Sequence, residues 1–417
     1  MANPRPRLMV RAAATVLAVS VVALSGCSVR RDAEGAAESL TAGTFYDVPN
    51  PLPPGAPGSL VRSERLLGAP DGSIAWRVLY RSTDVHGAPI AVSGIVVAPT
   101  GPAPSGGRPV VAWAHPTTGA QGDCAPSRGI DPFLLVEGLH ELLAAGYVIA
   151  ATDYSDMGAT GPPSYLVGTT EGHNVLDAAR AARALPEAGA GDRLLLWGHS
   201  QGGQAALFAG QLASAYSPEL RLVGVAVAAP AAELGQLLEA DLPDISGVTI
   251  GAYAFDAFQR VYGPGDPQVQ LSSILTPDAI AALPKMVPLC LLTHTKELHA
   301  IGDPLVGHFV TSDPRATEPW ATLLDENTPG AAPIGVPILV AQGLSDELVK
   351  PDTTTAYVNR VCSQGELVDY HQYPGINHGE VAERALPALL PWLAERVAGG
   401  SAPDTCTTET EPATSSG

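Results

Sequence analysis

Lysine is scarce in this chain of 417 residues: Lys285, Lys296 and Lys350 stand against a formal net charge of −19. Such an acidic surface repels phosphate backbones, so nucleic acid is not expected as a partner. No long apolar run follows the N-terminal region, which excludes a protein with several membrane spans. Cysteine is also rare, and no cysteine or histidine cluster has metal-ligand spacing. We therefore predict no metal site and no cofactor.

The N-terminal segment has the pattern of a bacterial lipoprotein signal. Arg5, Arg7 and Arg11 form a positive region, and residues 12–24 form an apolar run too short to read as a spanning helix. The run ends in the sequence LSGC at Cys27, which resembles a lipobox. This predicts a signal peptide over residues 1–26, lipid on the Cys27 thiol, and an extracytoplasmic protein anchored to the bacterial membrane. A plain secretory signal, with the protein released, is the alternative.

The remaining four cysteines predict disulfide bonds. They are Cys124, Cys290, Cys362 and Cys406. An even number in an oxidising compartment indicates two disulfides. Three connectivities are possible, and the residues alone leave all three open.

The composition and the apolar pattern predict one large α/β domain with an insertion. Hydrophobic residues make up 46% of the chain, enough for a sizeable core. Residues 74–83 and 89–98 read as an antiparallel strand pair. Strands and helices then alternate, which predicts a mostly parallel sheet with helices on both faces. The expected strands are 110–114, 147–152, 193–197, 222–228, 336–342 and 367–373, and the expected helices are 132–145, 170–185, 204–213 and 386–396.

The alternation stops between residues 230 and 335, where short helical pieces are separated by proline and glycine turns. We interpret 230–335 as a helical cap inserted into a core formed by 59–229 and 336–398; a decoration without a role in substrate binding is the alternative. Proline-rich residues 27–58 predict a flexible tether, and residues 399–417 predict a flexible tail. The expected cap helices are 231–240, 254–262, 277–286 and 320–324.

The sequence GHSQG at residues 198–202 marks a candidate nucleophile, Ser200. It follows the apolar run 194–197 and precedes a helix of small residues, which is the strand–turn–helix context that a G-x-S-x-G nucleophile needs. The turn is so tight that its flanking positions tolerate almost no side chain. A passive serine in a glycine-rich turn is the alternative.

The partners of a catalytic serine are expected after later strands, in the order acid and then base. Asp346 follows a buried strand, and Glu347 is its nearest rival. His378 follows the last expected strand and is the candidate base. His199 more plausibly packs against the turn, and His371 lies within a strand. Ser200, Asp346 and His378 therefore form the predicted triad.

Two backbone N–H groups are the expected donors to an oxyanion. One belongs to Gln201, directly after the nucleophile at a helix N-terminus. The other is expected from residues 115–119, after the strand 110–114. Pro116 has no N–H, so Thr117 is the first choice and Thr118 the second.

These residues together resemble the secretory lipase family of α/β-hydrolases, typified by fungal lipase A enzymes. The matching pieces are HPTTG at 115–119, DCAPS at 123–127, TDY at 152–154, YLVG at 165–168, GHSQG at 198–202, GLSD at 343–346 and NHG at 377–379. The resemblance implies an α/β-hydrolase core, a cap before the strand that carries Asp346, and hydrolysis of carboxylic esters. It also implies the pairings Cys124–Cys290 and Cys362–Cys406. Asp153 and Tyr154 could line the site, and a structural role for Asp153 is an equal alternative.

The sequence thus predicts a lipid-anchored serine esterase or lipase that acts through an acyl-enzyme. Its partners would be an ester or lipid substrate and the membrane that holds the anchor. An acyltransferase that uses the same triad is one alternative. A non-catalytic lipoprotein that binds apolar ligands is another.

Overall fold

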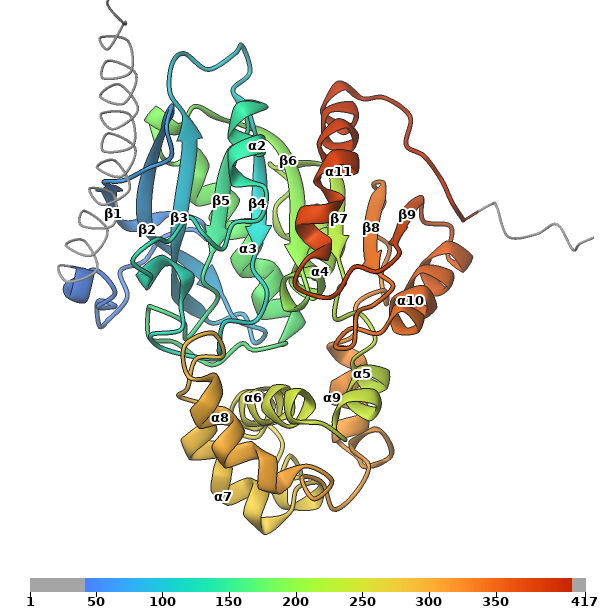
Figure 1. The fold of residues 1–417 in the computed structure, drawn as a ribbon. Helices are drawn as coiled ribbons and strands as arrows, with labels where there is room; N and C mark the ends of the chain where they lie inside the picture. The colour runs from blue at the N-terminus through green and yellow to red at the C-terminus, as the bar shows by residue number, and fades with distance from the viewer. Residues whose placement is uncertain (1–41, 407–417) are drawn as a thin grey trace, which may run out of the picture.

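Residues 42–406 are described by a computed structural model, which contains one nine-stranded sheet in the order β1-β2-β3-β5-β4-β6-β7-β8-β9 (Figure 1). β1, β2 and β3 pair in antiparallel fashion, and the strands from β5 to β9 in that order run parallel to one another. The predicted α/β fold with a mostly parallel sheet is confirmed. The strands are β1 Leu60–Leu66, β2 Ser73–Thr83, β3 Pro89–Pro99, β4 Arg108–Ala114, β5 Val148–Thr152, β6 Ala190–His199, β7 Arg221–Ala228, β8 Ile338–Gly343 and β9 Val368–Tyr373.

Helices cover both faces of the sheet, so its central strands are short apolar runs rather than alternating ones. Successive side chains of β4 pack into two different hydrophobic clusters, one on each face of the sheet. Val111 and Trp113 pack with α2 and α11, whereas Val110 and Ala112 pack with α3, α4 and α10. These helices are α2 Leu139–Ala144, α3 Gly168–Arg183, α4 Gln201–Tyr216, α10 Pro351–Ser363 and α11 Val381–Ala398.

A helical insertion separates β7 from β8 and forms a layer beyond one end of the sheet (Figure 1). The helix α6 begins earlier than predicted, because the Asp244 side chain accepts hydrogen bonds from the backbone N–H groups of Ser246 and Gly247 and so caps it. Helix α8 was not predicted. The insertion contains α5 Leu234–Asp241, α6 Ile245–Tyr262, α7 Pro277–Met286, α8 Thr295–Gly302 and α9 Trp320–Glu326.

The helix predicted over 132–145 is wrong over its first half. Only Leu139–Ala144 are helical, and Gly138 before them has a left-handed backbone with φ of 82°. A side chain at Gly138 would also meet Leu386 of α11, with 2.5 Å between its Cβ and the leucine Cδ2. The apolar spacing of 132–138 therefore reflects packing of an irregular segment.

Part of the predicted tether 27–58 packs against the folded domain. Phe45 and Tyr46 are buried, and the Tyr46 hydroxyl lies 2.9 Å from Ser127 Oγ. Their rings also lie under the guanidinium of Arg77. Arg62 adds hydrogen bonds to the Thr44 and Phe45 carbonyls, and Arg81 adds one to the Pro53 carbonyl.

Both disulfides implied by the resemblance are present. Cys124–Cys290 joins the loop after β4 to the insertion, with 5.1 Å between the Cα atoms. Cys362–Cys406 ties the described part of the tail to α10, with a Cα separation of 5.4 Å. The tail is held further by the Thr405 N–H, which donates to the Val368 carbonyl in β9.

The predicted signal peptide 1–26, the lipidation site Cys27 and residues 407–417 lie outside the described residues. Between residues 42 and 406, no helix combines the length and the apolar character needed to cross a bilayer. The same part of the chain holds no group of three or more histidine, cysteine, aspartate or glutamate side chains placed to bind a metal ion.

Candidate active site

Ser200 lies on a sharp turn between β6 and α4. Its φ of 58° and ψ of −118° are a strained conformation for a residue with a side chain, of the kind that costs about 1–3 kcal/mol and clusters at functional sites. The glycines around it are required by close backbone approach. A Cβ on Gly198 would lie 2.1 Å from the Gly202 carbonyl oxygen, and one on Gly202 would lie 1.9 Å from that of Ala114.

Asp346 and His378 are brought together at the carboxyl end of the sheet. Asp346 follows β8, His378 lies between β9 and α11, and 2.8 Å separates Asp346 Oδ2 from His378 Nδ1. The other carboxylate oxygen, Oδ1, accepts the backbone N–H groups of Leu348 at 2.9 Å and Val349 at 2.8 Å. Asp346 is therefore fixed at both oxygens and aimed at the imidazole.

The His378 ring lies next to the turn that carries Ser200. Its centroid is 4.8 Å from that of His199, the residue before the serine. Within residues 42–406 the Ser200 hydroxyl makes no side-chain hydrogen bond. Catalytic hydrogen bonds are commonly long in a free enzyme and tighten in its complexes.

His199 has a partner of its own, which the sequence did not suggest. Its Nδ1 lies 3.0 Å from Glu137 Oε1, and Glu137 belongs to the irregular segment before α2. The interpretation of His199 as a residue packed against the turn agrees with this contact. The sequence does not predict this pair, because Glu137 lies 62 residues before His199, in a segment expected to be helical.

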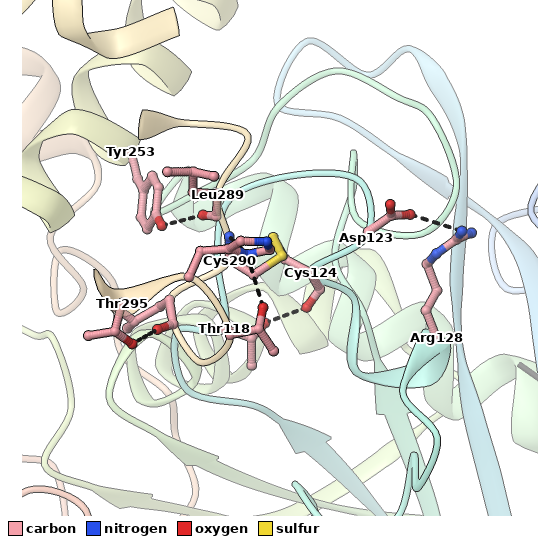
Figure 2. The surroundings of a disulfide bond; sticks show 11 residues. Thr118, Asp123, Cys124, Arg128, Tyr253, Leu289, Cys290 and Thr295 are labelled. Carbon is pink, nitrogen blue, oxygen red and sulfur yellow. Dashed lines mark hydrogen bonds and ion pairs between the residues drawn. A yellow bond between two sulfur atoms is a disulfide. The ribbon is translucent and has the colours of Figure 1, made fainter. Parts of the chain in front are cut away.

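The two candidate oxyanion donors lie beside Ser200. Thr117, Gln201 and Ser200 line one pocket, and Thr117 Oγ1 is 2.8 Å from the Tyr165 hydroxyl. Thr118 does not line this pocket, and its hydroxyl donates to the Cys124 carbonyl at 2.8 Å, beside the disulfide (Figure 2). This placement favours Thr117 over Thr118.

The pocket above Ser200 is lined almost wholly by apolar side chains and lies between the sheet and the insertion. One face of α6 runs along it, with Gly247, Ile250, Gly251, Ala254, Phe255 and Phe258. Helix α5 lines the pocket with Leu234, Leu237, Leu238 and the one acidic side chain of the lining, Asp241, and α9 lines it with Leu324. A pocket of this kind favours an apolar group attached to the carbon that Ser200 would attack.

Asp153 has a structural role. Its side chain is buried, and it accepts hydrogen bonds from Ser93 Oγ at 2.6 Å and from the Ser127 N–H at 2.9 Å. Tyr154 is buried beside it and donates to the His115 carbonyl at 3.0 Å. Both residues hold the loop that carries Thr117, and neither lines the pocket.

Burial lowers the pKa of His378, an effect that the hydrogen bond to Asp346 opposes and that the neighbouring His199 adds to. A histidine with a lowered pKa stays neutral, and so can accept a proton, at pH values below 6.5, the ordinary pKa of its side chain. We therefore expect the acid limb of kcat/KM for an uncharged ester to have its midpoint below pH 6.5. A pH profile from 4 to 8 checks this, and a midpoint above 6.5 would contradict it.

The sequence and the fold are similar to those of known proteins. A family model described as secretory lipase matches residues 130–405. A Mycobacterium tuberculosis protein described as a probable inactive lipase is 25% identical over 397 residues, which cover 85% of this chain and 82% of that one. Lipase A of Arthroderma benhamiae is 25% identical over 406 residues, covering 88% and 81%. The closed-state structure of Candida antarctica lipase A superposes with a TM-score of 0.72 at 18% identity, covering 87% of each chain.

Proposed function

The chain belongs to the secretory lipase family, and we propose that it is an extracytoplasmic serine esterase or lipase that cleaves carboxylic esters. The observation that carries the proposal is the strained turn of Ser200, open to an apolar pocket and next to the hydrogen-bonded pair of Asp346 and His378. A strained nucleophile beside an oriented base is the arrangement that acyl transfer requires.

In the proposed reaction, Ser200 Oγ attacks the ester carbonyl carbon and gives its proton to His378 Nε2. Asp346 holds the Nδ1–H of the ring and stabilises the imidazolium that forms. The N–H groups of Gln201 and Thr117 donate to the oxyanion. His378 then protonates the leaving alcohol, and the acyl group stays on Ser200. A water molecule, activated by the same histidine, releases the acid and restores the serine.

The pocket supports an ester with an apolar chain as substrate. The stretch of α6 from Gly247 to Phe258 is about 16 Å long at 1.5 Å per helical residue, roughly the length of a dozen methylenes. Each methylene that becomes buried in the pocket contributes at most about 0.8 kcal/mol to the free energy of binding. An acyl or alkyl chain of medium length would therefore fill the pocket.

We expect kcat/KM for p-nitrophenyl esters to rise with acyl length, by at most about fourfold per methylene, until the pocket is full. Ala254→Trp, which places a large ring in the pocket wall, should lower kcat/KM for the decanoate and leave the acetate as an internal control. A flat series in the wild type, or an equal loss for both esters in the variant, would contradict this assignment of the pocket.

The N-terminal segment is proposed to direct the protein out of the cytoplasm. Two disulfides in the described part of the chain suit an oxidising compartment. Lipid on Cys27 would then hold the enzyme at the membrane surface. Cell fractionation of Cys27→Ser tests this: the variant should leave the membrane fraction, and an unchanged distribution would contradict an anchor at Cys27.

A non-catalytic, ligand-binding protein is a second candidate, because one similar protein is described as a probable inactive lipase. A fluorophosphonate probe separates the two readings, since it labels only an activated serine. Failure of the native protein to react at Ser200 would favour the binding protein.

A further inference from the structure

Glu171 is a buried carboxyl group that the proposed reaction does not use. It lies in the first turns of α3, next to the pocket side of the Ser200 turn, and none of its surface reaches solvent. Its Oε1 accepts two hydrogen bonds, from Gln201 Nε2 at 2.6 Å and from the Leu166 N–H at 3.2 Å. Neither donor is a cation, and a buried carboxylate without a cation is costly.

Two buried oxygen atoms in this contact have no hydrogen-bond partner among residues 42–406. One is Glu171 Oε2 and the other is Gln201 Oε1. An ionised carboxylate has no proton to offer, so it would leave both oxygens unpaired. A protonated Oε2 supplies the donor that Gln201 Oε1 lacks. The acid and the amide can then form two reciprocal hydrogen bonds, and one proton satisfies both atoms.

Other groups around Glu171 agree with a neutral acid. Burial raises the pKa of Glu171 well above its ordinary value, and the hydrogen bonds from Gln201 and Leu166 oppose that shift. The titratable groups that face it are Tyr154, after β5, and Tyr165, before α3. Burial raises the pKa of both tyrosines as well, so they are uncharged at neutral pH. The positive end of α3 favours a charge on Glu171, but that effect is smaller than full burial.

The contacts of Glu171 reach both candidate oxyanion donors. Gln201 supplies one donor, and its side chain is the partner of Glu171. Leu166, which donates to Glu171, follows Tyr165, whose hydroxyl lies 2.8 Å from Thr117 Oγ1. The segment 165–166 thus connects the carboxyl group with the loop of the second donor.

We propose that Glu171 is a positioning residue of the oxyanion site: as a neutral carboxylic acid it pairs with the Gln201 side chain through two hydrogen bonds and so fixes the Gln201 N–H. This inference rests on the proposed function. Neutrality matters for a second reason. A carboxylate here would place a negative charge against the residue that has to stabilise the developing oxyanion.

Two variants test the pair. Glu171→Gln keeps a donor and an acceptor, because the Leu166 N–H holds the amide oxygen at Oε1 and directs the amide nitrogen to Gln201 Oε1. We expect kcat near that of the wild type at pH 7. Glu171→Leu should lower kcat about 10- to 100-fold with little change in KM, because the N–H is displaced. Glu141→Gln, at an exposed position of α2, is the control.

The inference fails if Glu171→Leu keeps full kcat, or if Glu171→Gln lowers kcat at pH 7 as much as Glu171→Leu does. Thermal unfolding gives a readout independent of activity. A carboxyl with a raised folded pKa stabilises the fold fully below its unfolded value, 4.5, and this contribution is lost as the pH rises through the folded pKa. The Tm of Glu171→Gln should therefore exceed that of the wild type by a margin that grows with pH. A constant margin would overturn the neutral pair, even if Glu171→Leu does not fold.

The same data separate this inference from the proposed function. If the wild type reacts with a fluorophosphonate at Ser200 but the Glu171 variants behave as controls, the function stands and the positioning role falls. If the wild type neither reacts nor hydrolyses esters, the proposed function falls, and with it the positioning role. A pH-dependent Tm margin would then show an acid–amide pair that serves the fold alone.

Discussion

Ser200→Ala is expected to lower kcat for p-nitrophenyl butyrate by about 10⁵-fold or more, as removal of a serine nucleophile does in other triads. In the proposed reaction, the oxygen of this hydroxyl forms the bond to the acyl group. The wild type and the variant should have the same Tm within the effect of removing one hydroxyl group, because the Ser200 side chain makes no hydrogen bond in residues 42–406.

Ser345 offers a matched control at the same carboxyl end of the sheet. Ser345 is exposed and directly precedes Asp346, so Ser345→Ala should keep the activity of the wild type. Hydrolysis by Ser200→Ala at more than about a hundredth of the wild-type rate would exceed what oxyanion donors and binding supply alone. Such a result would remove Ser200 from the role of nucleophile.

Asp346→Asn is expected to lower kcat about 10⁴-fold with the fold intact. The backbone N–H groups of Leu348 and Val349 donate to Oδ1 of Asp346. They would hold the oxygen of the new amide at that position and leave its NH₂ group facing His378 Nδ1. The imidazole would then carry its proton on Nε2, the nitrogen that has to accept the proton of Ser200.

Glu347→Gln is the control for this experiment, because Glu347 is the neighbouring carboxyl and is exposed. Its kcat for the same ester should match the wild type from pH 5 to 9. A strong loss in Glu347→Gln together with near-normal turnover by Asp346→Asn would reverse the assignment of the acid.

Much of the core could be predicted because its strands are buried on both faces. The run around Val110 and the run before Gly198 are apolar without interruption, and such runs mark central parallel strands. The proximity of Asp346 and His378 could be predicted for the same reason, since each follows a strand that the pattern shows. The spacing of GHSQG adds the turn, which only glycine at 198 and 202 permits.

The parts that could not be predicted depend on tertiary contacts between distant residues. Asn174 and Asp177 look like the solvent face of a helix, yet both are fully buried, and Asp177 accepts a hydrogen bond from Ser82 at 2.7 Å. Glu171, on the same helix, gave no signal either, because its partner Gln201 is known only from the fold. The burial of Phe45 could not be predicted, because the prolines that follow it favour an extended tether.

The most direct test of the account is the site at which a fluorophosphonate probe reacts with the native wild-type protein. Such a probe needs a serine activated by a base and by oxyanion donors. Peptide mapping by mass spectrometry should show a single adduct, on the peptide that carries Ser200, and denaturation before labelling should abolish it. Absence of an adduct, or an adduct on another serine, would contradict the central claim that Ser200 is the nucleophile.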